Sequence, residues 1–332
     1  MTALVFEVKK QRLAISGVLL FDKSRGLSSN FALQHVKRLF NAQKTGHTGT
    51  LDPLASGLLP LMFGEATKFA NDLIQASKTY EATVRLGYSS TTGDAEGELE
   101  EDSKRLQVIE NLGENHILEV FSHMKGSMEQ TPPMYSALKK EGKPLYEYAR
   151  QGVEVERQAR TIQLFQLNLL AFEKSGTEAS ISFEAECSKG TYIRTLGEDI
   201  AKALGTRGYL TALRRTKIGD LDVKEALTLE ALQALHEKAG QFSLEQSLIE
   251  VDSLLTHLQA ITLDQDSGRR FLHGQRLPLE LTGQPAGRVR VYANLGTEPA
   301  AGKTAVFLGT GTLETHGKGG LLRPERLIQV NL

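Results

Sequence analysis

The sequence predicts an α+β fold with a second, smaller β-rich unit at its C-terminal end. Strand-like and helix-like stretches are mixed along the chain without the regular alternation of βαβ units, which argues against a doubly wound sheet. From Ile261 onward, short strand-like runs are separated by turns that contain Gly and Pro, a pattern typical of small β-barrels. The chain has 332 residues, of which 40% are hydrophobic, and this is enough for two domains.

In the first half of the chain, hydrophobic periodicity predicts strands and helices in turn. The expected elements are a strand over 14–21, a helix over 28–40, a helix over 64–76, a strand over 78–90 and helical periodicity over 105–125. The helix over 28–40 starts at a serine, a residue that caps helices well, and it places Ala32, Val36 and Phe40 on one face.

The second half continues in the same mixed manner. We expect a strand over 180–187 and a helix over 191–204 that is closed by Gly205. A Leu-rich helical region over 228–258 follows, and everything from Ile261 onward is expected to be short strands.

Composition excludes several classes of protein. The single cysteine, Cys187, rules out an intramolecular disulfide and a Cys-based zinc site, and it fits a reducing compartment. The eight histidines are scattered without a metal-ligand spacing, so we expect no metal. No run reaches the roughly 20 apolar residues of a membrane span, and the first residues lack the order of a signal peptide. These features predict a cytoplasmic protein.

The net charge of −1 hides a strong local asymmetry. Residues 94–119 hold nine Asp or Glu and two Lys or Arg, whereas 189–217 hold seven Lys or Arg and two acids. From Ile261 to Leu332 there are nine basic residues and six acidic ones. Basic surfaces suit a polyanionic partner such as RNA, although solvated helix faces or a protein-binding module would also explain them.

One stretch, GHTGTLDPLASGLLPLMFGEATKF over 46–69, carries a single carboxylate, Asp52, before Glu65. Pro53 biases Asp52 toward extended backbone, and the surrounding glycines allow a close approach to a ligand. A loop of this kind can present one carboxylate to a substrate. The structural alternative is that Asp52 accepts backbone hydrogen bonds in an Asx-turn.

This stretch closely resembles the signature of bacterial tRNA pseudouridine-55 synthases, the TruB family, in which the Asp of the LDP triplet is catalytic. The resemblance runs from Gly17 to about Gly219, and the C-terminal strands resemble a PUA domain. Further matching motifs are GVLLFDKSRGLSSN (17–30), KTYEATVRLG (78–87), GDAEGE (93–98), QTPPMYSALKKEGKPLYEYARQGVEVE (130–156) and CSKGTYIRTLGEDI (187–200).

The resemblance implies both a domain plan and a reaction. It implies an N-terminal extension over 1–16, a catalytic domain over 17–258 and a PUA-like RNA-binding domain over 259–332. The catalytic domain is expected to have the pseudouridine-synthase fold, with a central mixed, mainly antiparallel sheet flanked by helices. The implied reaction isomerises one uridine, position 55 in the T-arm loop of tRNA, after that base is flipped from its stack. No cofactor or metal is implied, and we expect a monomer.

The resemblance also assigns the site residue by residue. Asp52 is the implied catalytic residue, and it adds to the uracil ring, attacks C1′ or takes the 2′ proton; all three routes require its ionised form. Arg194 of GTYIR is the implied ion-pair partner of Asp52. Tyr80 is expected to pack on the target base, and Tyr192 and Leu213 are expected to line its pocket.

His47 is the remaining implied RNA contact, made with the loop after the base has left the stack. For His47 the structural alternative is a turn residue, and for Tyr80 or Leu213 it is plain core. The expected phosphate contacts are Lys139, Lys140, Lys143, Arg214, Arg215 and Lys217.

The chain departs from the family pattern at two positions. Thr91 stands where an acid is common, although Asp94 remains, and Ser56 stands where Thr is usual. Two other functions are alternatives to the synthase. One is an RNA-binding protein without turnover, and the other is a glycoside hydrolase, which normally needs a second carboxylate.

Overall fold

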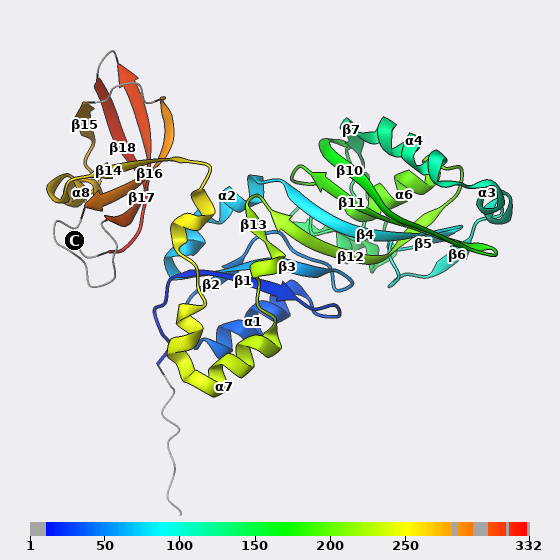
Figure 1. Cartoon of the computed structure of the whole chain (residues 1–332), viewed down its shortest axis with the longest axis horizontal. Coiled ribbons are helices and arrows are strands. Elements are labelled where there is room, and N and C mark those ends of the chain that lie inside the picture. The colour runs from blue at the N-terminus through cyan, green and yellow to red at the C-terminus, as the bar shows by residue number, and fades with distance from the viewer. Residues whose placement is uncertain (1–10, 281–284, 295–304, 317–318, 331–332) are drawn as a thin grey trace, which may run out of the picture.

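The computed structural model describes residues 11–280, 285–294, 305–316 and 319–330. In Figure 1 a large mixed α/β body carries a separate C-terminal sheet at one end. The expected extension over 1–16 lies partly outside the described residues, which begin at Gln11. The domain boundaries remain predictions.

A mixed sheet forms the centre of the large body. Within the described residues it has nine strands, in the order β1-β3-β12-β4-β11-β10-β7, with β2 beside β3 and β13 beside β12. β3 and β12 run parallel, and the other neighbours in this sheet are antiparallel, which confirms the predicted mixed, mainly antiparallel sheet. The strands are β1 Gly17–Lys23, β2 Thr45–His47, β3 Ser56–Phe63, β4 Lys78–Leu86, β7 Gly126–Gln130, β10 Arg160–Ser175, β11 Glu178–Cys187, β12 Gly208–Ile218 and β13 Leu221–Asp222.

Helices cover this sheet and join its strands. α6 buries Ile193, Leu196 and Ile200 against the sheet, and α4 lies beside it, while α1 and α7 lie together below β1 and β2 (Figure 1). The helices of the large body are α1 Ser29–Leu39, α2 Ala70–Gln75, α3 Arg105–Asn111, α4 Glu114–Met124, α5 Leu145–Ala149, α6 Ile193–Ala203 and α7 Leu229–Gln246, with 3₁₀ turns η1 Gly64–Phe69, η2 Val223–Glu225 and η3 Val251–Leu255. Two short hairpins complete it, β5 Tyr88–Ser90 with β6 Leu99–Glu101 and β8 Lys139–Lys140 with β9 Lys143–Pro144.

The C-terminal unit is a curled sheet in the order β14-β16-β17-β18-β15. Its strands are β14 Gln259–Leu263, β15 Leu277–Glu280, β16 Gly287–Asn294, β17 Ala305–His316 and β18 Gly319–Leu327. The expectation that only strands follow Ile261 is wrong, because a helix, α8 Gln265–Leu272, packs on this sheet. Asp264 caps α8 by accepting the N–H of Ser267 at 2.9 Å, and Phe271 of the same helix is fully buried.

Several predicted elements exist but are interrupted. The helix expected over 64–76 starts as 3₁₀ turn η1 before α2. The strand expected over 78–90 is divided at Gly87, and the helical region over 105–125 is divided into α3 and α4. Gly240 has φ of 71° and ψ of −165°, so it kinks α7 within the region expected over 228–258. The long strand β10 was not predicted.

The parallel contact between β3 and β12 depends on one glycine. Gly57 has φ of +102°, and a Cβ atom there would lie 2.2 Å from the carbonyl oxygen of Arg215. Because that distance is far below van der Waals contact and the backbone is left-handed, only glycine fits. This glycine lets the segment that carries Asp52 approach the strand that carries Leu213.

Candidate active site

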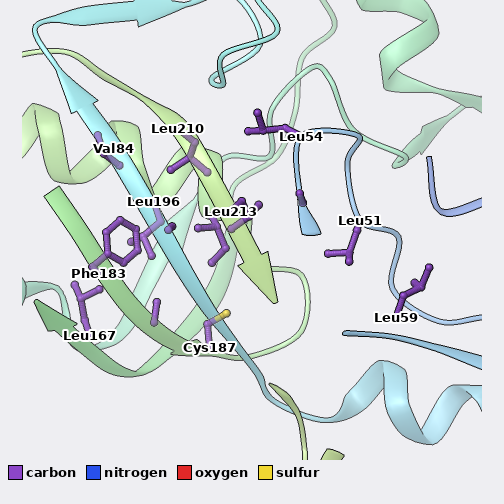
Figure 2. Packing of buried hydrophobic residues seen from close by; sticks show 14 of the residues in the cluster. Leu51, Leu54, Leu59, Val84, Leu167, Phe183, Cys187, Leu196, Leu210 and Leu213 are labelled. Carbon is purple, nitrogen blue, oxygen red and sulfur yellow. The ribbon is translucent and has the colours of Figure 1, made fainter. Parts of the chain in front are cut away.

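Asp52 lies between β2 and β3 in a segment that is fixed by buried neighbours. Leu51 and Leu54 are each 3% exposed and belong to the same hydrophobic cluster as Leu213 of β12 (Figure 2). The hydroxyl of Ser29 donates to the Leu51 carbonyl at 2.9 Å and accepts the Leu51 N–H at 2.8 Å. The loop is therefore anchored on both sides of Asp52, whose side chain is 40% exposed.

Arg194, near the start of α6, supplies the cation beside Asp52. Its Nε lies 3.1 Å from Oδ2 of Asp52, and its side chain is only 6% exposed. Nη1 donates to the carbonyl of Thr92 at 2.7 Å, Nη2 donates to the carbonyl of Tyr135, and Nη1 lies 3.7 Å from Oδ2 of Asp94. Because the guanidinium group is a rigid planar fork, these contacts hold it in one orientation toward Asp52.

Burial raises the pKa of the Asp52 carboxyl above its usual range. The positive charge of Arg194 opposes this effect, the negative charge of Asp94 adds to it, and the ammonium of Lys23 opposes it more weakly. A carboxylate that loses water stays ionised only when nearby cations compensate. Arg194 is therefore the main group that keeps Asp52 available as an anion.

Lys23 is a second cation near Asp52 that the sequence reasoning missed. It ends β1, is fully buried, and donates to the carbonyls of Ser24 at 3.0 Å and Leu27 at 2.7 Å. Burial lowers the pKa of Lys23 to about 8, while the charges of Asp52 and Glu96 raise it. A lysine at the end of an apolar strand gives no sequence signal of this burial.

A cavity of about 670 Å³ lies in front of Asp52. Of the predicted site residues, Asp52, Tyr80, Tyr192, Arg194 and Leu213 line it. The remaining lining residues are Gly49, Thr50, Leu51, Ile74, Lys78, Ser136, Ala137, Leu138, Ser188, Lys189, Gly190, Thr191, Ile193 and Arg215. Residues from separate parts of the chain are thus brought together around one carboxylate.

Among the described residues, His47 is the one predicted site residue that does not line this cavity. It ends β2, a few residues before Asp52, and its side chain is half-buried. Burial, together with the positive charge of Arg215, lowers the pKa of His47, so its ring is neutral near neutral pH. His47 lies beside the Asp52 loop, and its expected contact with RNA stays a prediction.

The two predicted tyrosines approach the cavity from different elements. Burial raises the pKa of the Tyr80 hydroxyl on β4, with Arg215 opposing the change, and burial also raises the pKa of Tyr192. Both hydroxyls are therefore protonated near neutral pH. The side-chain amide of Gln130 accepts the Tyr192 N–H at 2.7 Å and donates to its carbonyl at 3.1 Å. Gln130, at the end of β7, was missed because its role depends on this distant contact.

The expected phosphate contact at Arg215 is wrong. Arg215 is 1% exposed, and its guanidinium group donates to the carbonyls of Leu58 at 2.8 Å and Gly49 at 2.9 Å. It therefore supports the loop before Asp52 from inside the protein. Its neighbour Arg214 points to the other face of β12 and forms a two-point ion pair with Asp22.

The other expected phosphate contacts have exposed or half-buried side chains. Lys139 and Lys140 are exposed on β8. Lys143 on β9 is half-buried, with its ammonium 4.5 Å from the ring centre of Tyr148. The Lys217 side chain is 54% exposed, 3.7 Å from Asp222.

The two departures from the family pattern make local contacts. The hydroxyl of Thr91 accepts the N–H of Glu98 at 3.0 Å, so a hydrogen bond is present where an acid is common. The hydroxyl of Ser56 lies 3.4 Å from Nη1 of Arg214, from which it accepts a hydrogen bond.

Neither a metal-binding cluster nor a membrane-spanning helix is found among the described residues. They contain no group of three or more His, Cys, Asp or Glu side chains arranged to hold a metal ion. Over the same residues, every helix is too short or too polar to cross a bilayer.

Comparisons with known structures support the fold. A protein in the "Structure of H/ACA RNP bound to a substrate RNA containing 2'-deoxyuridine" superposes with a TM-score of 0.68 at 20% identity, covering 95% of this chain and 85% of the other. A protein in the "Crystal Structure of a Cbf5-Nop10-Gar1 Complex" gives a TM-score of 0.66 at 22% identity, with coverage of 94% and 84%. These similarities confirm the predicted pseudouridine-synthase fold.

Sequence comparisons cover nearly the whole chain. The chain is 50% identical over 322 residues to tRNA pseudouridine synthase B of Ralstonia pickettii (strain 12J), covering 97% of each protein. It is 51% identical over 297 residues to the protein of that name from Burkholderia mallei (strain ATCC 23344), covering 88% of this chain and 91% of the other.

Three family models match consecutive parts of the chain. The TruB family pseudouridylate synthase N-terminal domain matches residues 37–193, and the tRNA pseudouridylate synthase B C-terminal domain matches 194–256. The model "Pseudouridine synthase II TruB, C-terminal" matches 260–328. Together with the relatives that are about half identical, these matches establish that the chain belongs to the TruB family of pseudouridylate synthases.

Proposed function

We propose that this protein converts one uridine of tRNA, position 55 in the T-arm loop, into pseudouridine. The observation that carries the proposal is the Asp52 carboxylate, paired with Arg194 at 3.1 Å, in the wall of the cavity of about 670 Å³. The relatives named tRNA pseudouridine synthase B support the choice of tRNA as the substrate.

The reaction needs one anionic group beside the ribose and the base. The N-glycosidic bond breaks, the uracil turns, and its C5 atom bonds to C1′ of the same ribose. Asp52 adds to the ring, attacks C1′ or removes the 2′ proton, and each route uses the ionised carboxylate. Arg194 meets this need because its charge opposes the effect of burial on the pKa of Asp52.

The cavity suits a single nucleotide that has left its stack. Ligand pockets are typically about 300–1,000 Å³, a range that includes this one. Removing a base from its stack costs a few kcal/mol, and least in a loop. The rings of Tyr80 and Tyr192 and the side chain of Leu213 offer apolar surface to the base, and stacking on an aromatic ring offsets much of that cost.

The rest of the RNA is held through its phosphates. The candidates are the lysines of the β8–β9 hairpin, together with Arg214 and Lys217, whose side chains are at least partly exposed. Arg215 is removed from this set because it is buried. We further propose that the protein acts as a monomer in the cytoplasm and without a metal.

A glycoside hydrolase is disfavoured by the position of the second carboxylate. Asp94 is the acid that shares Arg194 with Asp52, but it is 2% exposed. Its Oδ1 accepts hydrogen bonds from the Thr92 hydroxyl at 2.6 Å and the Glu96 N–H at 3.0 Å. A general acid must reach the leaving oxygen, and a carboxylate enclosed in this way does not.

Mapping pseudouridine in tRNA from cells with and without this protein tests the proposal. We expect the T-arm modification to disappear when the gene is deleted and to return with the wild-type protein. An unchanged map would contradict the proposed substrate. Return of the modification with the Asp52→Asn protein would contradict the proposed chemistry and would leave RNA binding without turnover as the better reading.

A further inference from the structure

The short helix α2 contacts the C-terminal unit on one side. The Asp72 side chain is 7% exposed, and its carboxylate pairs with the guanidinium group of Arg288 on β16. Arg288 also contacts Glu325 of β18 at 2.6 Å. Immediately before α2, the ring of Phe69 lies 5.7 Å from that of Phe307 on β17. A charged contact and an apolar contact thus hold α2 and the C-terminal unit together.

The 3₁₀ turn η1 leads into α2. Its side chains bind backbone groups at the end of β18 and just after it. Nζ of Lys68 donates to the carbonyl of Leu327 at 2.8 Å, and Oε2 of Glu65 accepts the N–H of Gln329 at 2.7 Å. Lys68 and Glu65 also pair with each other at 2.7 Å. Both belong to GEATKF, the final part of the signature stretch. The signature therefore begins at the cavity and ends at the C-terminal unit.

On its other side, α2 contributes to the cavity. Ile74 is one of the residues that line it. The side-chain carbonyl of Gln75 accepts a hydrogen bond from Nζ of Lys189, which also lines the cavity. The same six-residue helix thus contacts the C-terminal unit and contributes to a wall of the cavity.

Lys78 fixes the end of α2 relative to the sheet. Its ammonium donates to the carbonyls of Leu73 at 3.1 Å, Ile74 at 2.8 Å and Ala76 at 2.6 Å. These contacts satisfy carbonyls at the C-terminal end of a helix, which have no partner within the helix. Lys78 starts β4, the strand that carries Tyr80, so a shift of α2 reaches the cavity through Lys78 as well.

A helix of six residues has little stability of its own in water, so tertiary contacts decide where α2 lies. We propose that docking of the C-terminal unit on Asp72 positions α2, and thereby the Ile74 and Lys189 wall of the cavity, so that this unit controls the rate of isomerisation. Asp72 and Arg288 are positioning residues in this scheme. The inference rests on the proposed function.

The test separates the rate of the reaction from RNA affinity. Asp72→Asn, Arg288→Gln and the double variant are compared with wild type in single-turnover reactions on a T-arm stem-loop at saturating enzyme, and their Kd values are measured by filter binding. The matched control is Glu314→Gln, which removes an ion pair with Arg323 inside the C-terminal unit.

We expect each single variant to slow the single-turnover rate by about tenfold to a hundredfold, because small misplacements at a site are costly. Both changes break the same contact, between Asp72 and Arg288. The single-turnover rate of the double variant should therefore be at most about twofold lower than that of the slower single variant. Kd should stay within about threefold of wild type, and Glu314→Gln should match wild type in both measurements.

Wild-type rates in the single variants, with or without weaker binding, would overturn the inference. So would losses that multiply in the double variant, because Asp72 and Arg288 would then act independently. If the wild-type protein itself forms no pseudouridine, the proposed function fails first, and the inference falls with it. Thermal unfolding checks each variant; if Asp72→Asn does not fold, Lys68→Met, which removes the separate contact with Leu327, decides by the same rate criterion.

Discussion

Arg194 contacts Asp52 through Nε, and the other arms of the same guanidinium group contact Asp94 and the carbonyls of Thr92 and Tyr135. One cation therefore joins the Asp52 loop, the segment that contains Asp94 and the segment before the β8–β9 hairpin. Because these segments are distant in sequence, the geometry at Asp52 depends on the whole large body being folded.

Asp52→Asn should abolish pseudouridine formation while RNA binding stays within several-fold of wild type. The amide has nearly the same shape but carries no charge, and every route open to Asp52 needs the ionised form. Tritium release from a T-arm transcript with 5-tritiated uridine measures turnover, and a gel shift measures binding. Asp266→Asn, an exposed change on α8, serves as control. Persistent tritium release in the Asp52 variant would remove Asp52 from the chemistry.

Arg194→Lys and Arg194→Ala should both lose most of the activity. Lysine keeps the charge, but its compact ammonium group cannot donate in all the directions in which the N–H groups of the guanidinium point. Arg194→Ala should also lower the free energy of unfolding by about 3 kcal/mol, because the buried Asp94 carboxylate loses its cation. Turnover assays and urea denaturation measure the two effects. Arg207→Lys, in an exposed pair with Glu100, is the matched control. Near-wild-type turnover in Arg194→Lys would show that charge alone suffices.

Turnover should fall on the acid side of neutrality as Asp52 becomes protonated. Burial raises the pKa of Asp52, so the midpoint of this fall should lie above the usual range of a carboxyl group. Lys23→Met removes a cation that opposes the rise, so the midpoint should move to still higher pH. Single-turnover rates across pH test this, with the exposed Lys238→Met as control. A midpoint that stays in place, or moves to lower pH, would contradict the role given to Lys23.

Gln130→Leu should lower both stability and turnover. The change leaves the N–H and the carbonyl of Tyr192 without their side-chain partner, and an unsatisfied buried group costs about 1–3 kcal/mol. Because Tyr192 would no longer be held at the cavity wall, kcat should fall more than KM rises. Gln166→Leu on an exposed position of β10 is the matched control. If the Gln130 variant is destabilised but keeps the wild-type kcat, Gln130 supports the fold and not the site.

Much of the fold was predictable because long periodic stretches give clear signals. The helix at α1 and the strand at β11 have the expected position and type. α8 was missed because it is short and lies in a region whose Gly and Pro residues suggested only strands and turns. β10 was missed because its sequence is apolar on both faces in places. Neither the two-residue period of a strand nor the 3.6-residue period of a helix is therefore clear in it.

The site was predictable only in part, for physical reasons. The Asp52 loop stands out by its composition, but the pairing with Arg194 was implied by the family resemblance and not by local pattern. Lys23 and Gln130 gave no signal, since their roles arise from burial and distant contacts. The burial of one of the two arginines Arg214 and Arg215 could have been predicted. Successive residues of a strand face opposite ways, so both side chains cannot reach solvent on one face.

The position of β12 between β3 and β4 has a consequence for how the protein is made. Residues 208–218 insert between two strands that leave the ribosome much earlier, so the central sheet cannot close until most of the large body has been synthesised. Pairings between segments so far apart form slowly. The nascent chain therefore carries Asp52 long before it has a pocket, and we expect the cavity to assemble late in translation, when β12 docks against Gly57.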